Sequence, residues 1–310
     1  MRAPLRWRIG LLAVMGMMTL PPTTATAQSR GVYPLGMTAV GSGVTPDPGF
    51  TYANQLLFYA RDESKANDGS TLPVSGRNAV IMDMNSFVWV SRGTFLGGAH
   101  YSAVATLPIA KNQLVSDIHG QLSGGGGFAD SYYLPLILGW NRPRASFRAL
   151  AGVLAPTGRF AAGASDNVGS GYWTPTLSAG QTIQMTPDNS LTLSAFQLYE
   201  FHTTQQGTET KPGDTMNLDY SVLRTFRSGT GPWLQVGVAG YEQRQTTAKT
   251  GPSISLEQSQ ERYAINALGI ASGLVFPEQR LSIGVRFFEE FSNRAAYQGY
   301  SFQLSGSVGF

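Results

Sequence analysis

The chain has 310 residues, with 22 Lys and Arg against 19 Asp and Glu, and it has no Cys, which excludes a disulfide framework and a thiolate metal site. Only 13% of its residues are charged, where soluble domains carry about 25%. Together with 37 Gly and 11% aromatic residues, this favours a sheet with one face in lipid and the other in water.

The N-terminus carries the pattern of a secretory signal peptide. Three arginines lie within the first eight residues, an apolar run covers residues 9–20, and Ala25-Thr26-Ala27 supplies small residues at a cleavage site. We therefore expect residues 1–27 to be removed and the mature chain to start at Gln28. The mature chain then holds 19 basic and 19 acidic residues. The excess of positive charge would have indicated a nucleic-acid partner, but it lies in the leader that is removed. No nucleic-acid partner is therefore predicted.

Residues 28–49 form a segment punctuated by Gly and Pro that does not have the pattern of a strand. Two arrangements are open for it, a disordered tail and a plug that folds into the interior of the domain that follows. The residues that would take part in a plug are Tyr33, Pro34, Pro46, Pro48 and Phe50.

The rest of the chain, residues 50–310, repeats short segments in which apolar and polar residues alternate. In the last one, from Tyr300 to Phe310, the even positions are mostly apolar and the odd positions are Ser, Gln or Gly, which predicts an amphipathic strand. Thirteen candidate strands lie near 50–60, 79–91, 97–108, 113–123, 128–140, 144–154, 172–184, 190–201, 214–226, 232–245, 261–276, 279–291 and 299–310. No apolar run of 18 residues interrupts them, so transmembrane helices are not predicted.

The connections between these segments alternate between short and long, as the periplasmic turns and outer loops of outer-membrane barrels do. The pattern predicts an all-β, antiparallel transmembrane β-barrel in a Gram-negative outer membrane, surrounded by outer-membrane lipid. An alternating strand that ends on Phe310 resembles the signal that the barrel-assembly machinery recognises. Because bacterial barrels have an even number of strands, we expect 12 strands, with 14 as the alternative. Either 50–60 belongs inside the barrel, or the glycine run Gly124–Gly127 hides a miscount.

Strand parity also predicts which polar residues face the lumen, since a charge that faces lipid is costly. The predicted lumen-lining residues are Asp83, Asn85, Arg148, Glu200, Asn217, Asp219, Gln235, Tyr241, Arg286 and Glu290. They would line a wet path for a solute or brace a narrow barrel.

Little in the sequence indicates catalysis or metal binding. The three histidines, His100, His119 and His202, accompany no Ser in a nucleophile-elbow pattern. Gly124–Gly127 lacks the Lys-Ser/Thr of a phosphate loop and is expected to be a strand end or loop. We therefore predict no catalytic residues, no metal site and no cofactor, with an outer-membrane hydrolase as the least favoured function.

Several segments resemble an outer-membrane transporter family associated with the meta-cleavage pathway of phenol degradation, itself distantly similar to fatty-acid and aromatic-hydrocarbon transporters. They are Gly31–Gly36, Pro46–Phe50, Ala129–Pro135, Leu138–Trp140, Pro156–Phe160, Asn167–Trp173, Pro212–Asp214, Asp219-Tyr220 and Gly240-Tyr241. The resemblance implies a channel or transporter for small hydrophobic compounds, aromatic ones among them. The alternative is a structural or adhesive surface barrel that acts through its extracellular loops.

Overall fold

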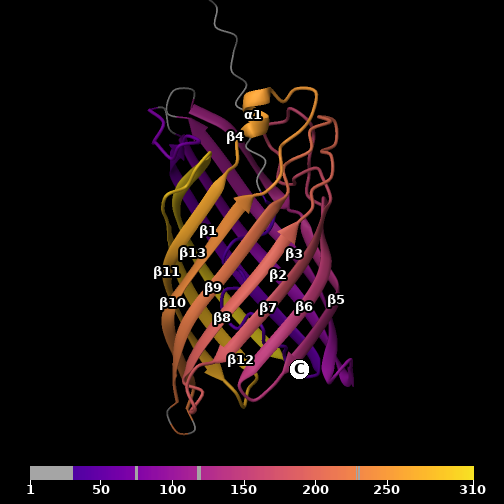
Figure 1. The fold of residues 1–310 in the computed structure, drawn as a ribbon, viewed down its shortest axis with the longest axis vertical. Coiled ribbons are helices and arrows are strands. Elements are labelled where there is room, and N and C mark those ends of the chain that lie inside the picture. The colour runs from indigo at the N-terminus through magenta and orange to yellow at the C-terminus, as the bar shows by residue number, and fades with distance from the viewer. Residues whose placement is uncertain (1–30, 74–75, 117–119, 228, 230) are drawn as a thin grey trace, which may run out of the picture.

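The computed structural model describes residues 31–73, 76–116, 120–227, 229 and 231–310. They form a tall, closed antiparallel β-barrel with strongly tilted strands (Figure 1). The predicted signal peptide, residues 1–27, lies outside the described residues. No helix in the described ranges is both long and apolar enough to cross a membrane.

Thirteen strands build the sheet. They are β1 (Gly49–Lys65), β2 (Gly76–Phe95), β3 (Ala99–Ser116), β4 (Gly120–Phe128), β5 (Ser131–Asn141), β6 (Ala145–Ala155), β7 (Thr174–Gln184), β8 (Leu191–Glu200), β9 (Thr215–Phe226), β10 (Trp233–Gln245), β11 (Ala264–Phe276), β12 (Leu281–Glu290) and β13 (Ala296–Gly309). One short helix, α1 (Leu256–Gln260), lies in the connection between β10 and β11 and is capped by Ser255.

Twelve of these strands close the barrel, and β4 is an additional strand. The first strand pairs with β2 on one side and with β13 on the other, so the circle closes between the two ends of the domain. On the far side, β3 pairs with β5 through its first part, His100–Thr106, and with β4 through its second part, Ile109–Ser116. The predicted twelve strands are confirmed, and the alternative of fourteen is wrong.

The miscount therefore lies at the glycine run. Residues 50–60 belong to the wall as β1, whereas the candidate near 113–123 is not a separate strand. Residues 113–116 end β3, which also contains most of 97–108, and residues 120–123 begin β4. Gly124–Gly127 lie in the last part of β4, which ends at Phe128, so the expectation of a strand end is confirmed and that of a loop is wrong. The strand is interrupted at Ala129-Asp130, which separate β4 from β5. Both strands run in the same direction along β3.

The two ends of the barrel differ as the sequence predicts. The connections 142–144, 185–190 and 277–280 are short and lie at one end, while 156–173, 201–214 and 246–263 are long and lie at the other. By the usual arrangement of outer-membrane barrels, the end with long connections faces outward from the cell. Between the two ends the outer surface is apolar: Leu234, Val236 and Val238 on β10, and Ile283, Val285 and Phe287 on β12, are all at least a third exposed. Such a band belongs in lipid.

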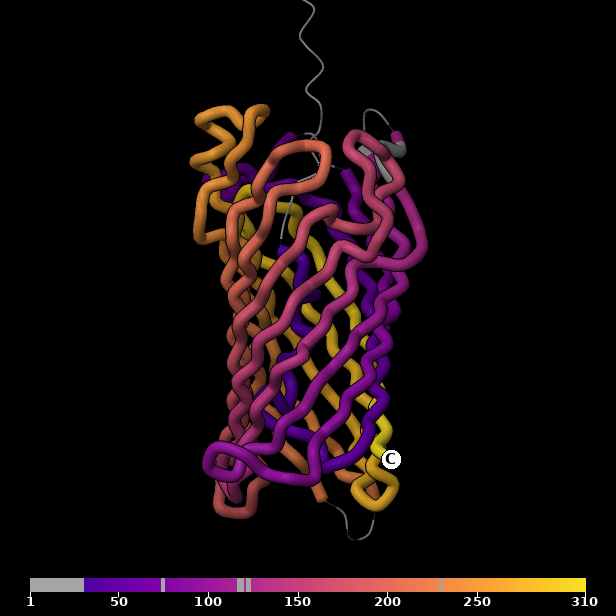
Figure 2. Tube along the Cα trace, turned by 90° about the vertical axis from the view of Figure 1, so that its right-hand side faces the viewer, coloured from indigo at the N-terminus to yellow at the C-terminus, as the bar shows by residue number. Residues whose placement is uncertain are grey.

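The N-terminal segment lies inside the barrel. Figure 2 shows it as an indigo trace surrounded by the strands. It runs from Gly31, near the extracellular loops, to Thr45, whose main chain exchanges hydrogen bonds with the Asn141 side chain beside the periplasmic turn 142–144. Tyr33, Leu35 and Ala39 are at most 4% exposed and pack in the main apolar cluster of the lumen. We call residues 31–45 the lumen segment.

Candidate functional site

The lumen segment is held by charged groups of the barrel wall, chiefly at one tight turn. Gly36 N and Thr38 N donate to the carboxylate of Asp219 on β9, at 2.9 and 3.1 Å, and Tyr33 donates to it through its hydroxyl at 2.7 Å. Arg286 on β12 donates through Nη1 to the carbonyl oxygen of Gly36, at 2.9 Å. Because Asp219 is fully buried, main-chain amides of the segment take the place of the water that would otherwise solvate this carboxylate.

A second carboxylate, Glu200 at the end of β8, binds the beginning of the segment. Its Oε1 accepts hydrogen bonds from Val32 N and Tyr33 N, both at 2.8 Å, and its Oε2 accepts one from Asn217 at 3.1 Å. Glu200 is 0% exposed. The buried carboxylates of Glu200 and Asp219 thus accept hydrogen bonds from main-chain N–H groups of the lumen segment.

Glycines of the wall let the segment approach closely. A Cβ atom at Gly180 on β7 would lie 2.0 Å from Ser42 O, and one at Gly139 on β5 would lie 1.8 Å from Thr45 Oγ1. No other residue fits at these two positions without displacing the segment. Arg148 on β6 adds a hydrogen bond from Nε to Ser42 O, at 2.8 Å.

The predicted lumen residues of β6 and β8–β12 lie on the lumen side. Arg148, Glu200, Asp219 and Arg286 contact the lumen segment as described above. The other members bond one another or neighbouring strands; they are Asn217, which accepts from Gln243, Gln235, which donates to Thr225, and Tyr241 and Glu290, which bond each other. Most of these residues therefore brace the barrel or hold the segment.

The prediction of a lumen-facing position is wrong for the two residues of β2. Asp83 and Asn85 share the parity of Ile81, Phe87 and Trp89, which are 40–50% exposed on the outer surface. They therefore face outward. The strand has its apolar residues on both faces, and Met84, which is 2% exposed, points inward.

Neighbouring polar groups on the outer surface accompany these two side chains. Asn54 of β1 donates to the carboxylate of Asp83, and Tyr52 donates through its hydroxyl to Asn85 Oδ1 at 2.6 Å. We call these four residues the outer polar cluster. It lies within the apolar band, which is an unusual place for a carboxylate.

Of the predicted plug residues, only two lie deep in the lumen. Tyr33 is 2% exposed, and Pro34 lines a cavity described below. Pro46 and Pro48 belong to the link that leads to β1 at the periplasmic end, where Asp47 pairs with Arg280 at 3.5 Å. Phe50 is wrong as a plug residue, because it is the second residue of β1 and is 60% exposed.

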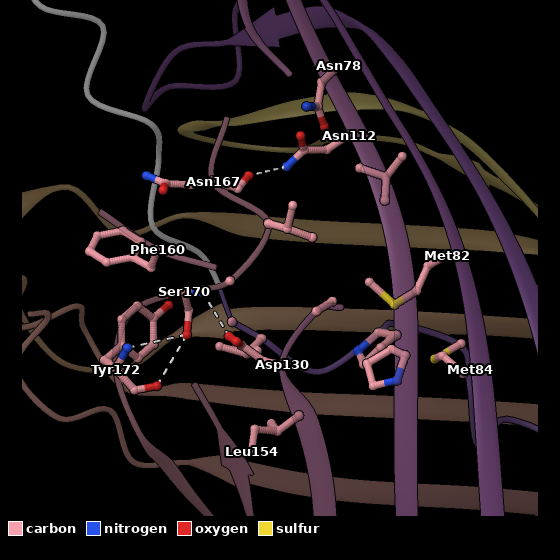
Figure 3. A pocket seen from close by; sticks show the side chains of 18 of the residues that line it. Asn78, Met82, Met84, Asn112, Asp130, Leu154, Phe160, Asn167, Ser170 and Tyr172 are labelled. Carbon is pink, nitrogen blue, oxygen red and sulfur yellow. Dashed lines mark hydrogen bonds between the residues drawn. The ribbon is translucent and has the colours of Figure 1, made fainter. Parts of the chain in front are cut away.

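A cavity of about 440 Å³ lies between the lumen segment and the extracellular loops. Figure 3 shows Met82 and Met84 on one side of the cavity, and Asp130, Ser170 and Tyr172 on the other, with Leu154 below Asp130. Val80, Pro108 and Met37 extend the apolar part, and Asn78, Asn112 and Asn167 form a polar edge. A largely apolar wall with a few placed polar groups is typical of a site for a small molecule.

Sequence reasoning missed the residues of this apolar wall. Val80, Met82 and Met84 alternate with polar residues on β2, and this signal was visible in the sequence. The prediction that Asp83 and Asn85 face the lumen puts these apolar residues on the lipid-facing side, because strand parity by itself treats the lumen as polar throughout.

One extracellular connection, residues 156–173, folds against the break between β4 and β5. The carboxylate of Asp130 accepts from Gly158 N at 3.1 Å and from Ser170 N at 2.8 Å. On β4, Gly124 N donates to Ser165 O at 2.7 Å, and a Cβ atom at Gly125 would lie 2.1 Å from Asp166 O. The glycine run is therefore a platform on which this loop rests, and the loop forms one side of the cavity.

The described histidines have structural partners. His100 Nδ1 lies 2.9 Å from Ser91 O, and His202 Nδ1 lies 2.9 Å from Thr174 Oγ1. The third histidine, His119, lies outside the described residues. Within the ranges that the structure covers, no group of three His, Asp or Glu is arranged to hold a metal ion.

Comparison with solved structures supports the same architecture. The COG4313 outer membrane channel from Pseudomonas putida F1 superposes with a TM-score of 0.68 at 11% identity, over 87% of this chain and 98% of that one. The CymD monoaromatic hydrocarbon channel gives 0.35 at 10% identity, over 85% and 89%. At that level the likeness to CymD carries no weight, and the likeness to the first channel shows the fold. No curated protein matches the sequence.

The family is established by sequence. Residues 61–305, which cover most of the barrel, match the family described as "Putative MetA-pathway of phenol degradation". This agrees with the resemblance carried by the segments from Gly31–Gly36 to Gly240-Tyr241, and with a closed barrel whose outer surface is apolar. The chain is an outer-membrane β-barrel protein and belongs to this phenol-degradation family.

Proposed function

We propose that this protein is an outer-membrane channel for small hydrophobic solutes, aromatic ones among them, and that the lumen segment is its gate. The observation that carries the proposal is the cavity of about 440 Å³, whose wall includes Met82, Met84 and Leu154 and borders the apolar cluster around Tyr33 and Leu35 in the lumen. An apolar wall here gives a hydrophobic solute a place to leave water. An apolar wall would not favour the passage of sugars or ions, which would lose hydrogen bonds to water there.

The gate follows from the position of the lumen segment below the cavity. Tyr33, Leu35 and Ala39 fill the middle of the barrel, and the path from the cavity to the periplasm runs through the space that they occupy. The segment is joined to the wall only by non-covalent contacts until it reaches β1 at Gly49. A movement of residues 31–45 toward the periplasm would open the lumen without breaking any pairing of strands.

Solute flux into liposomes tests the proposal. The refolded mature chain, residues 28–310, is compared with a chain that lacks residues 28–45 and keeps the link to β1. Phenol-like and alkyl solutes are compared with sugars of similar size, and leakage through protein-free liposomes is subtracted. We expect the mature chain to accelerate the hydrophobic set, and the truncated chain to admit the sugars as well. No flux through a folded barrel in either form would overturn the proposal.

A structural or adhesive role through the loops is the second candidate. It is favoured by the same segment, since a lumen that stays filled would leave only the extracellular surface to act. The discriminating result is binding that depends on the loops, with no solute flux in the liposome experiment.

A further inference from the structure

A second cavity, of about 430 Å³, lies at the extracellular end of β10 and β11, where they meet the connection between β12 and β13. Three arginines line it, Arg244 from β10, Arg262 from the residues before β11, and Arg294 from the connection. Among the described residues that line this cavity there is no carboxylate. The cavity thus collects guanidinium groups in one place, outside the site discussed above.

Strand parity places this arginine cavity at the outer surface. On β10, Leu234, Val236 and Val238 face outward, and Arg244 has the same parity and is exposed. On β11, Asn266 has the parity of Leu268 and Ile270, which are 49% and 65% exposed. The cavity therefore lies on the outer surface, on the extracellular side of the apolar band of these strands, where we expect the headgroups of the outer leaflet.

The floor of the cavity is held by main-chain and amide contacts. Asn266 donates through Nδ2 to Phe291 O and Ser292 O, both at 3.2 Å, and its main-chain N donates to Asn293 Oδ1 at 2.9 Å. The main chains of Ala264 and Arg294 bond each other in both directions. These contacts fix the backbone from which Arg294 projects.

The contacts of Arg244 and Arg262 with neighbouring residues use only some of their N–H donors. Arg244 donates through Nη2 to Asn266 Oδ1 at 2.6 Å, and the same atom lies 3.5 Å from Glu242. Arg262 donates through Nη1 to main-chain oxygens of Ser259 and Glu261. Three acids lie near but do not line the cavity: Glu242, Glu261 and the outward-facing Glu289. Since each guanidinium has five donors, most remain for a ligand.

A phosphate group matches this arrangement better than other anions of the cell surface. Guanidinium groups bind phosphate oxygens through paired, charge-assisted hydrogen bonds, and several guanidinium groups around one cavity suit a group with more than one negative charge. The apolar band below would accommodate the acyl chains attached to such a headgroup. The occupant that fits both features is a phosphorylated lipid of the outer leaflet.

We propose that the arginine cavity formed by Arg244, Arg262 and Arg294 binds the phosphorylated headgroup of an outer-leaflet glycolipid, whose acyl chains lie along β10–β12. This contact would fix the barrel's height and orientation in the membrane. It is independent of the lumen, so it can hold or fail whatever solute the channel admits.

Lipid retention measured by native mass spectrometry tests the proposal. The purified mature chain in detergent is titrated with diphosphorylated lipid A and with the same lipid after removal of its phosphates. The test variant carries Arg244→Gln, Arg262→Gln and Arg294→Gln. The control variant carries Arg142→Gln, Arg224→Gln and Arg227→Gln, three exposed arginines near the periplasmic end. Heat-modified migration on gels confirms that all chains are folded.

We expect the mature chain and the control variant to bind the phosphorylated lipid about tenfold more tightly than the test variant does. Removal of the phosphates should abolish that difference. Equal binding of the two lipids by the unmodified chain, or unchanged binding by the test variant, would overturn the proposal. Displacement of the lipid by an equal concentration of inorganic phosphate would also overturn it, since the site would then recognise a simple anion.

Discussion

Asp219 on β9 and Arg286 on β12 both bind the main chain of Gly36 in the lumen segment. The carboxylate of Asp219 accepts from Gly36 N, and the guanidinium of Arg286 donates to Gly36 O, each at 2.9 Å. The N–H group of Gly36 thus faces a negative charge of the wall, and its carbonyl oxygen faces a positive one. This relationship makes the turn the natural place to weaken the gate.

Replacement of Asp219 by Asn should loosen the lumen segment. The amide removes the negative charge that faces Gly36 N and Thr38 N, and it leaves Arg286 in a buried site without its counter-charge. We expect several-fold faster entry of sugars into liposomes. Asp188→Asn, in the periplasmic turn between β7 and β8, is the matched control and should leave entry unchanged. Equal flux in both variants and the parent would show that the turn does not gate the lumen.

Bulk added to the apolar wall of the cavity should slow the passage of hydrophobic solutes. Met82→Trp places a larger side chain in the cavity, whereas Ile81→Trp, one residue earlier on β2, adds the same bulk on the lipid-facing side. We expect Met82→Trp to reduce the flux of phenol-like solutes several-fold, and Ile81→Trp to have little effect. The proposed route through the cavity would be refuted if the two variants behaved alike.

The glycine run offers a prediction with a control one residue away. Gly125→Ala would place a Cβ atom 2.1 Å from Asp166 O, whereas at Gly126 the nearest atom is 3.7 Å away. We expect Gly125→Ala to detach the loop 156–173 from β4 and Gly126→Ala to leave it in place. Hydrogen exchange of residues 158–170 measures this. Equal protection in the two variants would contradict the role of β4 as a platform.

The outer polar cluster predicts a stabilising substitution. Asp83 faces lipid, where a carboxylate is unfavourable by an amount smaller than the roughly 2–4 kcal/mol found for Arg or Lys. We expect Asp83→Leu, made together with Asn54→Leu, to raise the free energy of unfolding in lipid bilayers by about 1 kcal/mol. Asp219→Leu, which empties a lumen-side anchor, should lower it. Should the double variant be less stable than the parent, the cluster would contribute to the fold in a way that its lipid-facing position does not explain.

His202 predicts how the loop between β8 and β9 responds to acid. Burial lowers the pKa of His202 below its ordinary value, against the opposing effect of Glu200 and Asp214. The folded state therefore binds a proton less readily than the unfolded state, and stability that is complete above the ordinary pKa of about 6.5 falls as the pH drops through the folded pKa. The protection factors of amides in residues 201–214, which correct for the slower intrinsic exchange in acid, should fall as the pH drops below about 6.5. His202→Gln should remove that dependence, and its persistence would exclude His202 as the cause.

Much of the fold could be predicted from the sequence, because barrel strands repeat one pattern and their connections alternate in length. Parity placed Asp219 and Arg286 on the lumen side, since their strands alternate cleanly. It failed on β2, where Met82 and Met84 face an apolar cavity and Asp83 faces outward. Hydrophobicity alone cannot tell lipid from an apolar lumen wall. The break at Asp130 and the position of β4 depend on which neighbour β3 pairs with at each height, and that information is not local to the sequence.

The lumen segment amounts to an intramolecular ligand on a short tether. Only the link around Pro46–Pro48 separates it from β1, and a tether that short holds a ligand at an effective concentration in the millimolar range. Even modest intrinsic affinity then keeps the lumen occupied, and each departure ends quickly in rebinding. A barrel that lacks residues 28–45 should consequently accept the missing stretch as a free peptide in trans, and the dissociation constant of that peptide would give the fraction of time for which the channel stands open.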